Sequence, residues 1–203
     1  MLKCTKYNVY NFENALRGMR NPLDSWSMAD SSFDGEIRMG ERDLRLAKQL
    51  RKAGSDHRKY LRQILVSVDI EGPLYWWKEF DTYKVATVAN STSTMHTIHK
   101  KGFIPEMFSI EDISEEGVRV FRDYLAYLEK LRLTYNETKD KETWNEMIKL
   151  LPSSFNQLRT VTLNYETLMG IYHARKNHKL VEWHRFCEWI ESLPYFKELA
   201  LEE

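Results

Sequence analysis

The chain has 203 residues, and its 30 Lys and Arg residues balance its 30 Asp and Glu residues, so its formal net charge is zero. This balance argues against a general nucleic-acid binder or a membrane-surface protein, because both need a strong basic excess. A local basic pocket for one small anion is compatible with it. The length suits one domain over residues 1–203, which is large enough to bury a core without disulfides or metal.

The sequence contains two cysteines, Cys4 and Cys187, which are far apart and have no CxxC spacing. We therefore expect neither a zinc site nor a disulfide framework, and a reducing, cytoplasmic setting is the default. Residues 1–21 contain no long apolar run, so no signal peptide is predicted. No stretch approaches the ~20 apolar residues of a membrane span.

The first half of the chain alternates between loop, helix and strand patterns. In order, we expect a loop over 21–40, a helix over 41–53, a strand over 62–70 and a helix over 73–84. Gly54 is suited to end the first helix. The strand is predicted because apolar residues alternate with Ser67 and Asp69. Gly72 and Pro73 should end this strand, and Pro73 also suits the first turn of the next helix.

The second half is predominantly helical. It is predicted to contain helices over 109–135, 141–151, 165–177 and 179–193, and one short strand over 159–163. Ser109, Asp140 and Asn164 are suitable N-caps for the first three of these helices. Helices outnumber strands, and the strands do not follow a βαβ rhythm, so the sequence favours an α+β fold.

Two groups of residues have both a structural and a functional interpretation. His96 and His99 are spaced as metal ligands can be, but they lack Asp, Glu or Cys partners nearby, so a surface or hydrogen-bonding role is favoured and no metal site is predicted. The basic segment 173–179 lies at the end of a predicted helix. It either complements the helix dipole or binds an anion through the planar guanidinium of Arg175.

Three segments together resemble the flavin-dependent thymidylate synthases, the ThyX family. They are GSDHRKYLRQILVSVDIEGP, PLYWWKEFDTYKVATVANSTSTMH and LNYETLMGIYHARKNHKLVEWHRFCEWI. The first resembles a family motif with a histidine, here His57, before an alternating strand. The second aligns without gaps with the family's helix and signature, and the third with its closing pattern. The resemblance spans residues 54–96 and 151–193, and the helices between them match the family's helical insert, about 109–151, by position only.

The resemblance implies a mixed sheet flanked by helices, assembled as a homotetramer with active sites between subunits. It also implies FAD as the cofactor, dUMP or a related pyrimidine nucleotide as the substrate, methylenetetrahydrofolate as the carbon donor and NADPH as the reductant. In that chemistry the cofactor and the uracil ring react, while the protein orients and polarises them. The chain further resembles short phage and prophage members of the superfamily. Tryptophans on amphipathic helices are expected to form the apolar subunit interface, namely Trp76, Trp77, Trp183 and Trp189.

Several positions depart from the family pattern. The signature arginine-histidine-arginine corresponds to Thr82, Tyr83 and Lys84, so only one positive charge remains. Two signature serines become Thr87 and Thr92. The remaining departures are Thr94 for a phosphate-binding arginine, Gln63 for a histidine and Arg62 for a glutamate.

The resemblance still implies a complete set of site residues. It assigns catalysis to Arg175, Lys84 and Thr92, with Arg175 as the retained arginine that polarises the uracil. It assigns substrate binding to Arg175, Lys84, Thr87, Thr92, Thr94 and His178. It assigns cofactor binding to His57, Gln63, Thr82 and Tyr83.

Three functions are compatible with these residues. The first is an enzyme that methylates or hydroxymethylates dUMP or a related nucleotide with flavin. The second is a catalytically inactive nucleotide-binding protein of phage origin that senses or sequesters a nucleotide. The third is a structural oligomer without a ligand. The retained Arg175 favours the first two, and the missing signature charges favour the second over the first, because each charge-assisted bond is worth about 1.5–3 kcal/mol.

Overall fold

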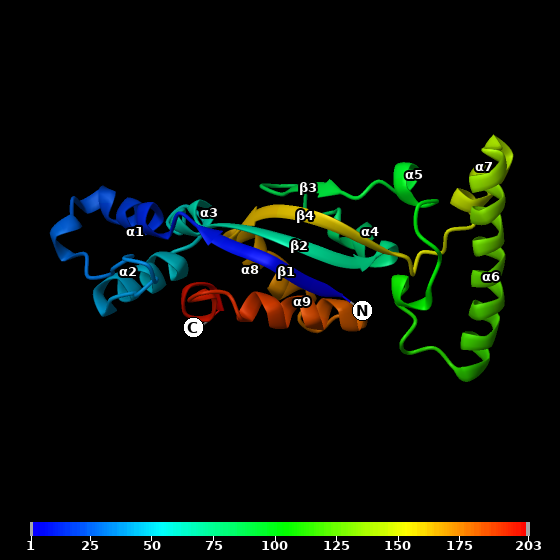
Figure 1. Cartoon of the computed structure of the whole chain (residues 1–203). Coiled ribbons are helices and arrows are strands. Elements are labelled where there is room, and N and C mark those ends of the chain that lie inside the picture. Colours follow the sequence, from blue (N-terminus) through cyan, green and yellow to red (C-terminus); the bar gives the residue numbers. More distant parts are fainter. Residues whose placement is uncertain (1, 202–203) are drawn as a thin grey trace. The chain divides into compact units, whose positions relative to one another are not determined.

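A computed structural model describes residues 2–201 (Figure 1). Its strands are β1 (Lys3–Tyr10), β2 (Leu65–Pro73), β3 (Val88–Ser91) and β4 (Asn156–Asn164). Its α-helices are α1 (Phe12–Arg20), α2 (Glu41–Lys52), α3 (Tyr60–Gln63), α4 (Leu74–Phe80), α5 (Thr94–Thr97), α6 (Glu115–Thr138), α7 (Lys141–Lys149), α8 (Tyr165–Arg175) and α9 (Val181–Glu191). Short turns of other helix types are η1 (Asn21–Leu23), η2 (Trp26–Met28), η3 (Pro105–Met107) and η4 (Lys197–Leu201).

The strands form one sheet in the order β1-β2-β4-β3. The N–H of Tyr165 donates to the carbonyl of Ile64 at one end of the β2–β4 pair, and the N–H of Leu74 donates to Phe155 at the other, so these strands run antiparallel. Cross-strand contacts in the other two pairs have the same orientation. The predicted α+β fold is confirmed, and the sheet that we expected to be mixed is antiparallel.

The chain divides into two compact units. The first contains residues 2–3, 70–82 and 90–159, and the second contains residues 4–69, 83–89 and 160–201. None of the helices within residues 2–201 is long and apolar enough to cross a membrane. The single-domain assignment made from the sequence stays a prediction.

The first unit has its core between α6, α7 and the segments beside them. The α6 helix buries Leu125, Leu128 and Leu131, which pack with Met147 of α7. The α6 helix begins later than predicted, because the side chain of Ser114 accepts the N–H of Gly117 and caps it. The predicted cap, Ser109, is instead buried, and its hydroxyl donates to Oδ1 of Asn156 at 2.8 Å.

The segment around residues 90–94 ends β3 and begins α5, where the side chain of Ser93 accepts the N–H of His96. All four residues of β3 are exposed, so the strand has no buried face and no alternation of apolar and polar residues that would mark it in the sequence. Val88 is the one β-branched residue of β3, so pairing with β4 rather than local propensity accounts for the strand.

The second unit confirms most of its predicted elements. Val66 and Val68 of β2 are fully buried, whereas Ser67 and Asp69 are half-buried, as the alternating pattern predicted. The α2 helix ends before Gly54, whose φ of 106° is in the left-handed region that glycine adopts easily. The predicted cap of α8 is also correct, because Oδ1 of Asn164 accepts the N–H of Thr167 at 2.9 Å.

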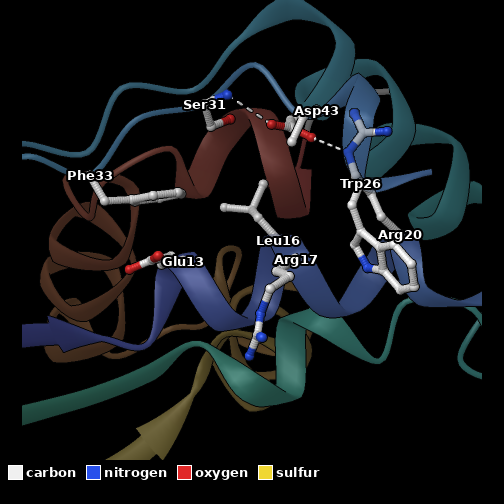
Figure 2. Close-up of a pocket in the computed structure, with 9 residues that line it drawn as sticks. Glu13, Leu16, Arg17, Arg20, Trp26, Ser31, Phe33 and Asp43 are labelled. Carbon is white, nitrogen blue, oxygen red and sulfur yellow. Dashed lines mark hydrogen bonds and ion pairs between the residues drawn. The ribbon is translucent and has the colours of Figure 1, made fainter. Parts of the chain in front are cut away.

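A pocket of about 280 Å³ lies between α1, the 21–40 segment and α2 (Figure 2). At its edge, Nε of Arg20 donates to Oδ1 of Asp43 at 2.6 Å, and both side chains are at most 3% exposed. The other oxygen of Asp43 accepts the N–H groups of Asp30 and Ser31. This buried ion pair therefore joins the irregular 21–40 segment to both helices.

Candidate functional site

Arg175, the last residue of α8, is the predicted site residue around which other side chains gather. Its Nε donates a hydrogen bond to the hydroxyl of Tyr83 at 2.8 Å. The centre of its guanidinium group lies 4.7 Å from the ring of Trp183, a distance at which a cation is attracted to an indole face. The rings of Tyr83 and Trp183 meet edge to face at 6.1 Å. The guanidinium is therefore held in one plane by a hydrogen bond and an aromatic surface.

Local sequence explains how this group forms. Asn164 fixes the start of α8, which places Arg175 in the last turn, where a positive charge is favoured by the helix dipole. The chain then turns into α9, which packs on α8 and carries the fully buried Trp183. Tyr83 comes from a separate loop, residues 83–87, and is half-buried.

His178 lies in the turn between α8 and α9. Its Nδ1 accepts the N–H of Leu180 at 3.1 Å, and its ring lies 6.2 Å from that of Trp183. A ring nitrogen that accepts a hydrogen bond is unprotonated, so the neutral form of His178 carries its proton on Nε2. His178 therefore lies just beyond the C-terminal end of α8, and its assignment to the substrate stays a prediction.

The 83–87 loop brings two more predicted residues close to Tyr83 in the chain. Lys84 is exposed, whereas the hydroxyl of Thr87 donates to the carbonyl of Val85 at 3.3 Å. The hydroxyl of Thr167 on α8 donates to the same carbonyl at 3.4 Å. Ala86 has a φ of 53°, a left-handed conformation that is unfavourable for alanine. The loop is therefore tightly turned and attached to α8.

Three predicted site residues belong to the first unit. The hydroxyl of Thr82 donates to the carbonyl of Glu79 at 2.7 Å, and that of Thr92 donates to the carbonyl of Leu158 at 3.1 Å. Thr94 is half-buried at the start of α5. The hydroxyls of Thr82 and Thr92 thus satisfy backbone carbonyls of their own unit, and the assignment of all three residues to a ligand stays a prediction.

The predicted cofactor residues His57 and Gln63 line a second pocket of about 350 Å³. Tyr60 closes one side; its hydroxyl donates to the carbonyl of Ala47 at 2.9 Å, and burial raises its pKa. Gly18 also lines the pocket and lets the side chain of Gln63 come close to α1, because a Cβ at Gly18 would lie 3.1 Å from Oε1 of Gln63. The pocket is at the small end of the range for drug-sized ligands, so it fits one ring of a cofactor such as FAD rather than the whole dinucleotide.

The structure brings one predicted cofactor residue together with a predicted nucleotide residue. The hydroxyl of Tyr83, assigned to the flavin, contacts Arg175, assigned to the nucleotide, and both assignments stay predictions. The contribution of Trp183 to the position of Arg175 was not predicted. Trp183 is eight positions after Arg175, and the turn between α8 and α9 brings the two side chains together. The contact therefore cannot be predicted from the spacing of residues within one helix.

Within residues 2–201, no group of His, Cys, Asp or Glu side chains is arranged to hold a metal ion. The ring of His99 packs edge to face on Tyr135 at 5.2 Å. Its carbonyl accepts hydrogen bonds from Arg132 and Asn136. His99 therefore has a structural role in joining the segment after α5 to α6.

Comparison with known proteins defines the class of fold. No protein-family model matches the chain, and no curated protein matches it. Among solved structures, it is similar to the flavin-dependent thymidylate synthase ThyX of Helicobacter pylori, crystallised with FAD and dUMP. Two such structures superpose with a TM-score of 0.74 at 18% and 19% sequence identity, and cover 98% of this chain and 96% and 97% of theirs. The chain therefore has the ThyX fold along almost its whole length.

Proposed function

We propose that this protein binds a pyrimidine nucleotide of the dUMP class at Arg175. The observation that carries the proposal is the position of the Arg175 guanidinium, which is held by the hydroxyl of Tyr83 and the ring of Trp183. A guanidinium that is already oriented loses little conformational entropy when it donates to a carbonyl or a phosphate. His178, whose N–H donates to the carbonyl of Arg175, and Lys84, which follows Tyr83 in the chain, add polar groups of the kind that contact nucleotides. The dUMP in the Helicobacter pylori structures supports the choice of ligand.

Flavin-dependent methylation or hydroxymethylation of that nucleotide is the second candidate. The pocket beside His57 and Gln63 favours it, because it has room for one ring of FAD. FAD would supply the redox chemistry, with methylenetetrahydrofolate as the carbon donor and NADPH as the reductant. Arg175 would orient the pyrimidine, and the pocket walls would exclude water from the ring. Against catalysis, only Lys84 keeps a charge from the family signature, which favours a protein that senses or sequesters the nucleotide.

The assembly expected from the sequence needs a different interface. Trp76, Trp77 and Trp183 are at most 1% exposed within a single chain, so they cannot form the apolar contact between subunits. A homotetramer remains our proposal, now resting on the resemblance alone. A phage or prophage origin rests on the same ground. Cys4 and Cys187 are both free thiols, which supports the proposed cytoplasmic setting.

The test is a calorimetric titration of dUMP into the wild-type protein and into Arg175→Ala. Loss of a charge-assisted pair should weaken binding by about 2–3 kcal/mol, or roughly thirty- to two-hundred-fold. Arg175→Lys should recover little, because an ammonium group cannot reproduce the fork. Arg45→Ala, which removes an exposed arginine of α2, is the matched control and should bind as the wild type does. Equal binding by a folded Arg175→Ala would refute the proposed site.

A further inference from the structure

The pocket between α1, the 21–40 segment and α2 belongs wholly to the second unit. Figure 2 shows Phe33 and Trp26 on opposite sides of it, with Leu16 between them. We call this cavity the Phe33 pocket. Its volume is about 280 Å³, whereas an engineered apolar cavity of about 150 Å³ holds one benzene molecule. The Phe33 pocket therefore has room for one aromatic ring with a short polar chain.

The Phe33 pocket is separate from the pocket beside His57, although both use α1. An α-helix turns by about 100° per residue. Gly18, which lines the pocket beside His57, is two positions from Leu16 and two from Arg20, which line the Phe33 pocket. Gly18 therefore lies on the opposite face of α1, and a ligand of the Phe33 pocket does not enter the predicted cofactor pocket.

The two aromatic rings of the Phe33 pocket are held in place by local hydrogen bonds. Phe33 lies in a short hairpin, in which the N–H groups of Ser32 and Arg38 each donate to the other residue's carbonyl at 2.9 Å. Nε1 of Trp26 donates to Oδ1 of Asn21 at 2.9 Å. A ligand thus meets rings that are already oriented, which lowers the entropic cost of binding.

The wall formed by the 21–40 segment is also attached firmly to α2. Oδ1 of Asp30 accepts the N–H of Asp43 at 3.0 Å, and Oδ2 of Asp43 accepts the N–H of Asp30 at 3.0 Å. Gly40 allows this contact, because a Cβ at Gly40 would lie 2.2 Å from Cγ of Asp30. The pocket is therefore preformed, as small-molecule sites usually are.

The charges at the edge of the pocket leave one carboxylate available. Arg20 is paired with Asp43, and Nη2 of Arg17 donates to Oδ1 of Asn14 at 2.9 Å. Figure 2 shows the side chain of Arg17 extending away from the middle of the pocket. Glu13 is exposed at the edge, and within residues 2–201 its carboxylate has neither a hydrogen bond nor an ion pair.

We propose that the Phe33 pocket binds a small primary amine that carries one aromatic ring. The ring would pack on Leu16 and against the rings of Phe33 and Trp26. The ammonium group would pair with the carboxylate of Glu13, and aromatic faces attract a cation as well. A carboxylate or phosphate fits less well, because it would be repelled by Glu13 while both guanidinium groups are engaged. This site goes beyond the proposed nucleotide site and does not depend on it.

The experiment titrates 2-phenylethylamine into the full chain and follows the indole N–H signal of Trp26 by NMR. The signal is assigned from the spectrum of Trp26→Phe. At pH 7 the amine is protonated, since an alkyl ammonium group such as that of lysine has a pKa of about 10. We expect a dissociation constant on the order of 1 mM or below, as for a very small ligand in a preformed pocket.

A second ligand tests the charge. 3-Phenylpropionate keeps the ring and replaces the amine by a carboxylate. At the same ionic strength, about 0.15 M, screening is equal for both ligands. We expect 3-phenylpropionate to bind at least roughly tenfold more weakly, because its charge is repelled by that of Glu13.

Variants test whether the named residues form the site. Glu13→Gln should weaken binding of the amine roughly two- to fivefold, as expected for loss of one exposed charged contact, and should not weaken binding of 3-phenylpropionate. Phe33→Ala should weaken both ligands, because the ring contact serves both. Glu116→Gln is the matched control, since Glu116 is an exposed acid in the first turn of α6 as Glu13 is in that of α1. It should bind both ligands as the wild type does.

Three results would overturn the proposal. The first is a Trp26 signal that does not respond to the amine. The second is equal affinity for the two ligands, or an affinity for the amine that is unchanged in Glu13→Gln. The third is displacement of the amine by dUMP, because the amine would then bind at the Arg175 site. Failure of dUMP to bind would instead refute the proposed function and leave the Trp26 response to the amine intact.

Discussion

The hydroxyl of Tyr83 accepts a hydrogen bond from Nε of Arg175 at 2.8 Å, while both side chains contact the ring of Trp183. The phenol of Tyr83 therefore orients Arg175, the arginine at which we propose nucleotide binding. This hydrogen bond restricts rotation of the guanidinium group next to the indole ring of Trp183. Tyr83 is thus a positioning residue for Arg175.

Tyr83→Phe keeps the ring and removes only the hydroxyl. We expect the free energy of unfolding to fall by roughly 0.5–1.5 kcal/mol, because one half-buried hydrogen bond is lost. Affinity for dUMP should fall roughly three- to tenfold, since the guanidinium becomes free to rotate. Tyr127→Phe removes a phenol that donates to Glu146 in the first unit and serves as the matched control. Unchanged dUMP affinity in Tyr83→Phe would show that the hydroxyl of Tyr83 does not position Arg175.

FAD should bind weakly. Two of the predicted cofactor residues already have partners in the chain, because the hydroxyl of Thr82 donates to the carbonyl of Glu79 and that of Tyr83 accepts from Arg175. The other two, His57 and Gln63, line a pocket that has room for one ring of FAD. A titration of FAD into the apoprotein, followed by flavin fluorescence, should give a loose complex. Stoichiometric FAD that is retained through gel filtration would show that other residues have replaced the family signature.

The buried pair between Arg20 and Asp43 should be important for stability (Figure 2). Asp43→Asn leaves the positive charge of Arg20 buried without a counter-charge, which typically costs about 3–5 kcal/mol. Urea unfolding should show this loss, with exposed Asp34→Asn as the control. A loss below about 1 kcal/mol would indicate that water reaches the pair, since exposed ion pairs contribute no more than that.

The elements that the sequence predicted well have one buried face. The α8 and α9 helices and β2 bury regularly spaced apolar residues, and the caps Asp140 and Asn164 mark helix starts by local hydrogen bonds. In contrast, β1 was not predicted, because most of its side chains are exposed and no alternation marks it. Pairing with β2 makes it a strand, and that partner is distant in sequence.

The same reasoning applies to the site. Arg175 was predicted because it lies within a motif of neighbouring residues. Its contacts with Tyr83 and Trp183 depend on tertiary packing, which a linear motif does not encode. Only folding brings these residues together.

The contact between Tyr172 and Glu191 should make stability depend on acid pH. The phenol of Tyr172 donates to Oε1 of Glu191 at 2.5 Å, and Nζ of Lys197 lies 2.9 Å from Oε2. The bond from Tyr172, followed by that from Lys197, lowers the pKa of Glu191, and the same bond raises the pKa of Tyr172 to about 12. A carboxyl whose folded pKa is lowered stabilises the protein above its unfolded pKa, near 4.5, and this contribution is lost as the pH falls through the folded value.

Tyr172→Phe should therefore reduce the Tm at neutral pH and have less effect once the pH is well below the ordinary pKa of glutamate. Thermal melts of the wild type and the variant, recorded from about pH 7 to about pH 3, should converge at the acid end. Tyr10→Phe, at a tyrosine that is 50% exposed, is the control and should follow the wild-type curve. A difference in Tm between Tyr172→Phe and the wild type that is the same at every pH would show that the phenol contributes packing alone, because a hydrogen bond to the ionised carboxylate must weaken when Glu191 is protonated.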